Sequence, residues 1–147
     1  MSVALLDVNV LLALAWPSHL HHEIAHRWFT THHTAEWATC PMTQCAFVRI
    51  SMNPRYSGLG EVSVRAAALL ESVVELPFHE FWADDLPFSA DEVPKAGITG
   101  HRQITDAYLL GLAAHHGGKL VTLDRGISAF APPGSAWVDS LEVIGVE

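Results

Sequence analysis

Three aspartates stand beside strongly hydrophobic segments, where the apolar pattern gives no reason for a charge. Asp7 lies in Leu-Leu-Asp-Val-Asn-Val-Leu, Asp106 in Ile-Thr-Asp-Ala-Tyr-Leu-Leu, and Asp124 in Val-Thr-Leu-Asp-Arg-Gly. Burying one carboxylate without a partner is costly, and burying several together costs more. A shared divalent cation resolves this conflict, and carboxylate oxygens suit Mg²⁺ or Mn²⁺. The three aspartates are therefore candidate metal ligands and catalytic residues.

A metal held by carboxylates suits the hydrolysis of a phosphodiester bond. The ion orients a water molecule, lowers the pKa of that water and stabilises charge on the phosphate, and a pair of ions clamps both the attacking and the leaving oxygen. Polar residues near the aspartates are candidates to hydrogen-bond the carboxylates or a metal-bound water: Asn9, Thr105 and Thr122. The residue types thus point to phosphoryl chemistry.

Each aspartate also has a purely structural interpretation. Asp106 can stabilise the positive end of a helix dipole, Asp124 can be a turn residue before Arg125 and Gly126, and Asp7 can cap the helix that follows it. Taken singly, each structural interpretation is favoured. Taken together, three such residues at one expected crevice favour a site.

The expected elements alternate between short apolar strands and helices. Strands are expected at 3–6, 38–40, 119–123, 137–138 and 141–146, with one more inside 77–100, and helices at 10–15, 18–31, 43–52, 60–74 and 104–116. This order predicts an α/β fold with a parallel sheet covered by helices on both faces. The functional crevice of such a sheet lies outside the carboxyl ends of its strands. Asp7 and Asp124 stand at two of those ends, and Asp106 lies in the first turn of a long helix.

Composition limits the class of protein. The 147 residues fit one domain over 1–147, and half of them are hydrophobic, which suffices for a buried core. No stretch reaches the ~18 uninterrupted apolar residues of a membrane span, and no basic segment precedes the first apolar run as in a signal peptide. We therefore expect a cytoplasmic protein without a membrane partner, in which Cys40 and Cys45 are reduced, buried thiols.

The formal net charge of −8 argues against holding nucleic acid by bulk electrostatics. It does not exclude an acidic pocket in which a metal ion supplies the positive charge. Basic residues are few, and Arg49, Arg102 and Arg125 are candidates to contact an RNA phosphate, as are Arg55 and His101. The alternative for these residues is charge pairing with neighbouring carboxylates.

Several segments together resemble the PIN domain family. The run Leu-Leu-Asp-Val-Asn-Val-Leu-Leu-Ala-Leu from Leu5, the helix Thr-Asp-Ala-Tyr-Leu-Leu-Gly-Leu-Ala from Thr105, and Leu-Val-Thr-Leu-Asp-Arg-Gly from Leu120 are similar to its signatures. The helix from His22 to Phe29, and Pro-Met-Thr-Gln-Cys-Ala-Phe-Val-Arg-Ile from Pro41, resemble the VapC branch of that family. The resemblance runs in order through most of the chain.

The resemblance implies a PIN-like three-layer α/β/α sandwich with a central, mainly parallel sheet. It also implies an endoribonuclease that depends on Mg²⁺ or Mn²⁺ and acts as the toxin of a type II toxin–antitoxin system. Further implications are a VapB-type antitoxin that neutralises it, and assembly as a homodimer. Carried over by motif, Asp7, Asp106 and Asp124 would be the carboxylates of the metal site.

One departure from the family pattern bears on activity. PIN domains usually place a glutamate in the helix that starts near Thr43, and Ala46 stands where we expect it, with the neutral Gln44 nearby. Whether another glutamate compensates stays open; the candidates are Glu23, Glu36 and Glu61. A degenerate PIN domain that binds RNA or protein without cleaving is therefore the second hypothesis. A metallo-phosphoesterase acting on DNA or small phosphoesters is the third.

Other chemistry-bearing residues have ordinary structural interpretations. The ten histidines are expected at the surface and at helix ends, and a transition-metal site at His22 and His26 is the less favoured alternative. Trp82 belongs to the core by its residue type, or else stacks on a base or meets a partner from its loop-rich segment.

Overall fold

The fold is built on one five-stranded sheet in which all neighbouring strands run parallel. The computed structural model describes residues 2–32, 34–54 and 62–145. The strand order is β3-β2-β1-β4-β5, with bounds β1 Ala4–Leu6, β2 Trp37–Thr39, β3 His79–Phe81, β4 Lys119–Thr122 and β5 Leu141–Val143. Because all the strands run the same way, their carboxyl ends form a single edge, and β1 lies at its centre.

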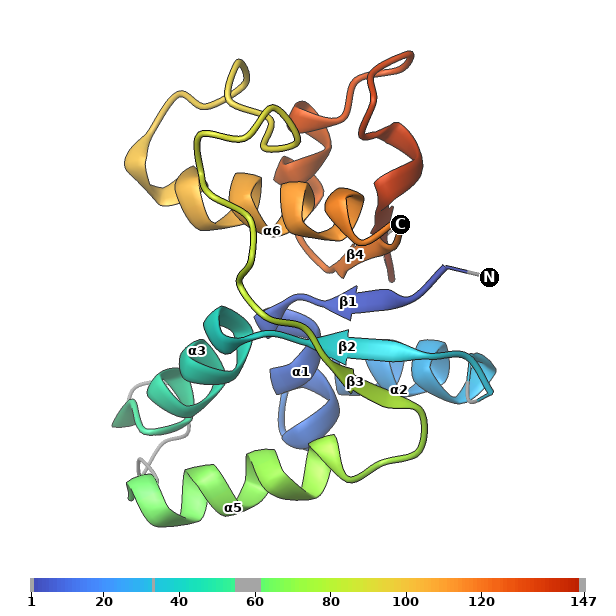
Figure 1. Ribbon diagram of the computed structural model, residues 1–147. Coiled ribbons are helices and arrows are strands. Elements are labelled where there is room, and N and C mark those ends of the chain that lie inside the picture. Colours follow the sequence, from blue (N-terminus) through green and yellow to red (C-terminus); the bar gives the residue numbers. More distant parts are fainter. Residues whose placement is uncertain (1, 33, 55–61, 146–147) are drawn as a thin grey trace.

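Helices cover both faces of this sheet (Figure 1). On one side lie α1 Val8–Ala15, α2 His22–Thr31, α3 Pro41–Ser51 and α5 Ser63–Val74, and on the other lies α6 Ile104–His115. The short 3-10 helix Arg125–Phe130 packs on the α6 side through Ile127 and Phe130. This is the expected three-layer α/β/α sandwich with a parallel central sheet, and that prediction is confirmed.

The alternation of side chains along the strands explains the two layers of core. Leu5 and Leu120 pack with α6, whereas the next residues, Leu6 and Val121, pack with α1 and α3. All four side chains are fully buried. Successive residues of a strand point to opposite faces, so a parallel sheet covered on both sides needs consecutive apolar residues.

The end of α6 illustrates how glycine allows a tight return to the sheet. Gly117 has a φ of 69°, in the left-handed region that favours glycine and commonly closes a helix. At Gly118 a Cβ would clash with the backbone carbonyl of Val3. The paired glycines therefore let β4 start directly beside β1.

Two expected helix starts and one expected strand differ most from the structure. The second helix starts at His22 rather than Ser18, because 17–21 forms turns and the N-cap His21 makes no side-chain capping bond. The third starts at Pro41, a residue suited to the first helical position. The strand expected at 137–138 is wrong, since Trp137 donates its indole N–H to the Glu92 carbonyl (2.6 Å) and a 3-10 helix follows at Val138–Ser140.

None of the helices that the structure describes is long and apolar enough to cross a membrane. The start expected for the fourth helix at residue 60 lies outside the described residues. Of the two cysteines expected to be buried, Cys40 is buried, whereas Cys45 is exposed on α3.

Candidate functional site

Asp7 occupies the centre of the carboxyl edge of the sheet. It directly follows β1 and caps α1, and its Oδ1 accepts a hydrogen bond from the Val8 N–H (2.7 Å). Its Oδ2 accepts from the Thr122 hydroxyl (2.8 Å). The residue is only 4 % exposed, and this burial raises the pKa of the carboxyl, with a smaller opposing effect from the two hydrogen bonds. The negative charge of Asp124 raises that pKa further.

The Thr122 hydroxyl joins the ends of β1 and β4. While it donates to Asp7, its oxygen accepts from the Asn9 side-chain amide (3.2 Å) and from the Asp124 backbone N–H (3.0 Å). The Asn9 amide oxygen in turn accepts from the Leu123 N–H (3.1 Å). Thr122 thus contacts a carboxylate directly, whereas among the described residues Asn9 is linked to Asp7 through Thr122.

Asp106 and Asp124 face the same acidic region from two other elements. Asp106 lies half-buried in the first turn of α6, and its carboxylate accepts no hydrogen bond within the described part of the chain. Burial raises its pKa to about 6, with additional repulsion from Asp7 and Asp124. Asp124 is exposed and accepts from the Gly126 N–H (2.8 Å), so its role as a turn residue is also realised. The three carboxylates therefore interact electrostatically with one another.

The donor set of this acidic cluster, Asp7, Asp106 and Asp124, fits a hard divalent cation. No three His, Cys, Asp or Glu side chains among residues 2–32, 34–54 and 62–145 already lie close enough to enclose an ion. A closed cage is not what Mg²⁺ requires, because this ion keeps several waters and usually binds one or two carboxylates. The mutual repulsion of the carboxylates is the property that a cation would relieve.

Two neutral residues of α3 stand where a fourth carboxylate would be expected. The Gln44 side-chain amide donates to the Thr39 hydroxyl at the end of β2 (2.9 Å), which places Gln44 at the carboxyl edge of the sheet. Ala46 is two positions further along the helix and half-buried. Because a step of two residues turns an α-helix by about 200°, Gln44 rather than Ala46 is the position directed at this edge.

The glutamates considered as replacements lie elsewhere. Glu36 directly precedes β2, at the amino edge of the sheet and therefore opposite the acidic cluster. Glu23 is exposed on α2, beside His26 and Arg27. Glu61 lies outside the described residues.

The candidate RNA contacts that the structure describes lie at the surface. Arg102 lies in the 3-10 helix His101–Gln103 that leads into α6, and Arg125 follows Asp124. Arg49 is exposed on α3, where it borders an apolar hollow facing α5. Thr105 is exposed beside Asp106. Arg55 lies outside the described residues.

Trp82 is part of the core and is not available to stack on a base. It is 5 % exposed and stacks on the His116 ring, with 4.1 Å between ring centroids. The core interpretation of this tryptophan is confirmed.

Asp84 is a further carboxylate at the carboxyl edge, and the sequence pattern did not reveal it. It follows β3 by three residues, and desolvation raises the pKa of its carboxyl, partly offset by a hydrogen bond from Cys40. Its position just after a strand was the available signal, but β3, with the sequence His-Glu-Phe, is too short and too polar to be recognised from the sequence.

Comparison with known proteins decides the family. The model of the PIN domain family matches residues 4–131, a range that contains all three aspartates. The chain belongs to the PIN domain family. Among its relatives, Ribonuclease VapC38 of Mycobacterium tuberculosis is 47% identical over 131 residues, which cover 88% of this PIN domain chain and 90% of the relative.

Two more ribonucleases of Mycobacterium tuberculosis are similar to this PIN domain over most of their length. Ribonuclease VapC39 is 42% identical over 132 residues, or 89% of this chain and 95% of the relative. Ribonuclease VapC29 is 44% identical over 124 residues, or 84% of this chain and 87% of the relative. The expected resemblance to the VapC branch of the PIN family is confirmed.

Proposed function

We propose that this PIN domain is a VapC-like toxin, an endoribonuclease that hydrolyses phosphodiester bonds of RNA with Mg²⁺ or Mn²⁺ bound at the acidic cluster. The observation that carries the proposal is the convergence of Asp7, Asp106 and Asp124 from three elements, with pKa values raised by burial and mutual repulsion for the first two. The names of the VapC ribonucleases to which the chain is similar support the activity.

In this proposal the three carboxylates have different roles. Asp7 and Asp106 hold the principal ion, and Asp124 completes the pocket directly or through water. When bound, the ion supplies an activated water and stabilises charge on the phosphate. Hydrogen bonds from the Val8 N–H and the Thr122 hydroxyl fix both oxygens of Asp7, leaving one lone pair on each for the ion.

Positioning of the substrate depends on a few arginine side chains near the acidic cluster or on α3. Because the chain carries a net charge of −8, RNA is attracted near Arg102 and Arg125 rather than by the protein as a whole. Arg49 is a third candidate, on α3. We expect single-stranded or looped RNA to be the substrate, because its backbone can bend to reach a site recessed at a sheet edge.

The same proposal includes the partners and the setting of a VapC-like toxin. We infer that a VapB-type antitoxin neutralises the enzyme in the cytoplasm and that the enzyme forms a homodimer. The net negative charge of the chain suits an antitoxin segment that is basic.

The test is cleavage of a labelled, looped RNA with Mn²⁺ by the wild type, Asp7→Asn and Asp139→Asn. Asp139 is an exposed carboxylate of a separate 3-10 helix, so its variant controls for the loss of one charge. We expect metal-dependent cleavage by the wild type and Asp139→Asn, and only the metal-free background with Asp7→Asn. Equal cleavage by Asp7→Asn would overturn the proposal.

The lack of a glutamate at Gln44 and Ala46 favours the degenerate binding module as the second candidate. RNA binding that does not depend on metal, with no cleavage by folded wild type on RNA, DNA or small phosphoesters, would establish that module. Cleavage of DNA or small phosphoesters alone would indicate a different metallo-phosphoesterase.

A further inference from the structure

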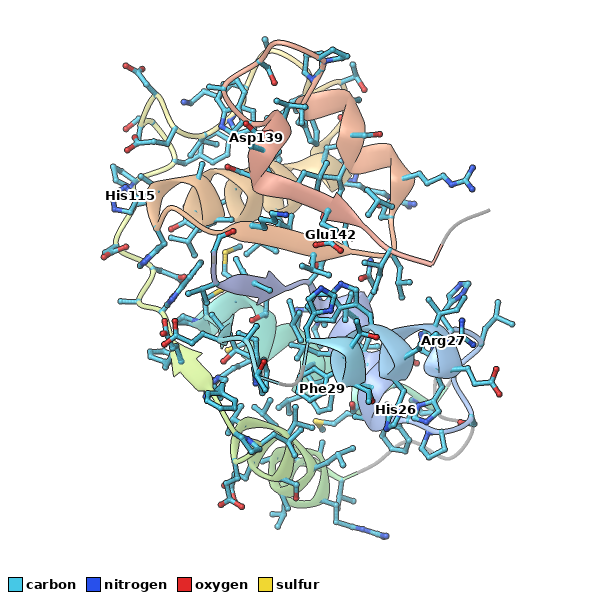
Figure 2. The ribbon with its side chains drawn as sticks, turned by 90° about the vertical axis from the view of Figure 1, so that its right-hand side faces the viewer. His26, Arg27, Phe29, His115, Asp139 and Glu142 are labelled. Carbon is cyan, nitrogen blue, oxygen red and sulfur yellow. The ribbon has the colours of Figure 1, made fainter. Side chains whose placement is uncertain are left out.

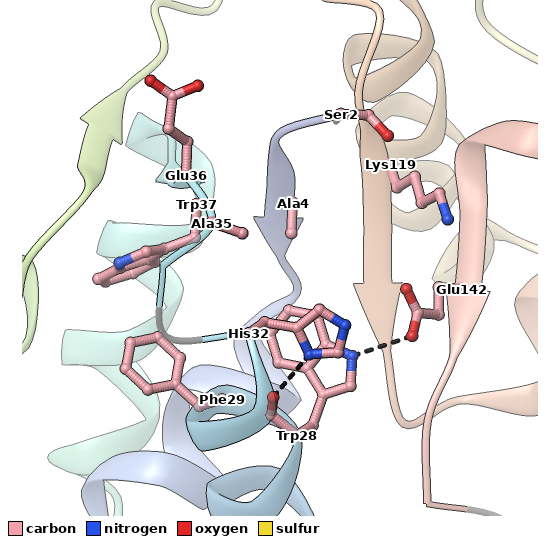
Figure 3. Close-up of a pocket in the computed structure, with 10 residues that line it drawn as sticks. All are labelled: Ser2, Ala4, Trp28, Phe29, His32, Ala35, Glu36, Trp37, Lys119 and Glu142. Carbon is pink, nitrogen blue, oxygen red and sulfur yellow. Dashed lines mark hydrogen bonds between the residues drawn. The ribbon is translucent and has the colours of Figure 1, made fainter.

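A cavity of about 310 Å³ opens at the amino ends of the strands, on the edge opposite the acidic cluster (Figure 3). It lies between the end of α2 and the starts of β1, β2 and β4, with β5 beside them. Figure 2 views the molecule from this side and shows Glu142 on β5 above α2, which carries Phe29. The residues that matter for its chemistry are Trp28, Phe29, His32, Trp37, Lys119 and Glu142.

The aromatic wall of this cavity is held in a fixed arrangement. The rings of Trp28 and His32 stack with their centroids 4.2 Å apart, and Phe29 meets Trp37 edge-on at 5.4 Å. The His32 Nδ1 lies 2.7 Å from the Trp28 carbonyl oxygen, and the Trp28 indole N–H donates to Glu142 Oε2 (2.9 Å). A ligand would therefore meet a preformed surface, which lowers the entropy cost of binding.

Hydrogen-bond acceptors dominate the polar part of the wall. Glu142 is half-buried, and its second oxygen, Oε1, has no hydrogen-bond partner in the described part of the chain. Because a carbonyl only accepts, the Nδ1 of His32 carries the proton of the neutral ring, so its Nε2 is an acceptor. The carbonyl end of the α2 dipole adds negative potential.

The charged side chain that contacts the aromatic wall is a carboxylate, Glu142. Two carboxylates, Glu36 and Glu142, and one ammonium, Lys119, belong to the lining. Glu36 points away from the rings in Figure 3, so Glu142 is the charge that meets a ligand beside them. Lys119 makes no ion pair with Glu142 in the described structure, which leaves the carboxylate able to pair with a ligand.

We propose that this cavity binds a small organic cation that carries an amine or guanidine group. An aromatic wall attracts a cation through the ring quadrupole, and the free oxygen of Glu142 accepts its N–H groups. The cavity volume lies at the small end of the range for ligand sites, about 300–1,000 Å³, which suits a ligand of a few carbon atoms. This site lies across the sheet from the acidic cluster and does not depend on the proposed nuclease activity.

The test is calorimetric titration of agmatine, which carries both an amine and a guanidine, into the wild type, Glu142→Gln and Glu71→Gln. Glutamine at 142 keeps an oxygen to accept from Trp28 while removing the charge. Glu71 is exposed on α5 and makes no side-chain contact with the cavity, so its variant is the matched control. We expect saturable binding at one site, weakened at least about tenfold by Glu142→Gln and unchanged by Glu71→Gln.

A second variant tests the cavity without altering its charge. Ala35→Leu extends an apolar side chain from the turn before β2 into the cavity and should abolish agmatine binding. Adenosine monophosphate, an anion with a flat ring, should not compete. Absence of saturable agmatine binding to the wild type, equal binding by Glu142→Gln and Ala35→Leu, or preference for adenosine monophosphate would overturn the proposal.

Discussion

Replacing Asp106 by asparagine should stabilise the metal-free protein. The pKa of this carboxyl rises from 3.8 to about 6 on folding, because burial and the charges of Asp7 and Asp124 disfavour its ionised form. The folded protein therefore holds the proton more tightly than the unfolded chain, and stability falls as the pH rises between these two values. Above about pH 6 the whole penalty is present, and asparagine removes it.

The size of this effect follows from the shift. At about 1.4 kcal/mol per pKa unit, a shift of roughly two units corresponds to about 3 kcal/mol. Because Asp106 is only half-buried, solvent screens the repulsion, and we expect about 1–2 kcal/mol. For a domain of this length that gain raises the Tm by roughly 3–6 °C.

The assay is thermal unfolding followed by circular dichroism, with EDTA, at pH 7.5 and pH 4.5. Asp106→Asn should unfold at a higher temperature than the wild type at pH 7.5, and the difference should shrink at pH 4.5, where the folded-state carboxyl is protonated. Asp139→Asn, which removes an exposed carboxylate away from the cluster, should change the Tm little at either pH. Adding Mn²⁺ should raise the Tm of the wild type more than that of Asp106→Asn.

Two outcomes would refute this reasoning. A lower Tm for Asp106→Asn at pH 7.5 without metal would mean that the carboxylate is stabilised rather than repelled in the folded protein. An equal gain at both pH values would mean that the effect does not arise from ionisation of this group.

Three further predictions follow from the same site. Thr122→Val should lower the free energy of unfolding by about 1–3 kcal/mol, since it leaves Asp7 and the Asp124 N–H without their hydroxyl partner; Thr122→Ser should restore it, and chemical denaturation measures both. RNA cleavage at subsaturating Mn²⁺ should fall as the pH drops through about 6, because Asp106 becomes protonated and loses affinity for the ion; a pH profile that stays flat from 7 to 5 would contradict this. Gln44→Glu should increase Mn²⁺ affinity and lower the metal-free Tm, because it adds one more carboxylate at the carboxyl edge. Ala46→Glu, on a different side of α3, should do neither, and calorimetry and thermal unfolding compare the two.

The parallel sheet could be predicted from sequence because its strands are short apolar runs flanked by helices. Leu5 and Leu6 are adjacent and both fully buried, which is the pattern that a sheet covered on both faces requires. Once the strands are parallel, Asp7 and Asp124 must share an edge. The position of the acidic cluster is therefore a consequence of local patterns and one topological rule.

What the sequence could not reveal depends on contacts between distant segments. The Thr122 hydroxyl donates a hydrogen bond to Asp7, 115 positions away in the sequence. No local sequence pattern specifies that contact. The strand expected at 137–138 was wrong for the same reason, because the Trp137 indole N–H donates to the Glu92 carbonyl, 45 positions away in the sequence. The cavity beside Glu142 is likewise made by α2 and by strands from both ends of the chain.

The central claim is that Asp7, Asp106 and Asp124 form one site for a divalent cation in the free protein. Calorimetric titration of Mn²⁺ into metal-free wild type, Asp7→Asn and Asp139→Asn at pH 7.5 tests it most directly. We predict saturable binding to the wild type and to Asp139→Asn, and its loss in Asp7→Asn with the fold retained by circular dichroism. Absence of Mn²⁺ binding to folded wild type, or equal binding by Asp7→Asn, would contradict the claim.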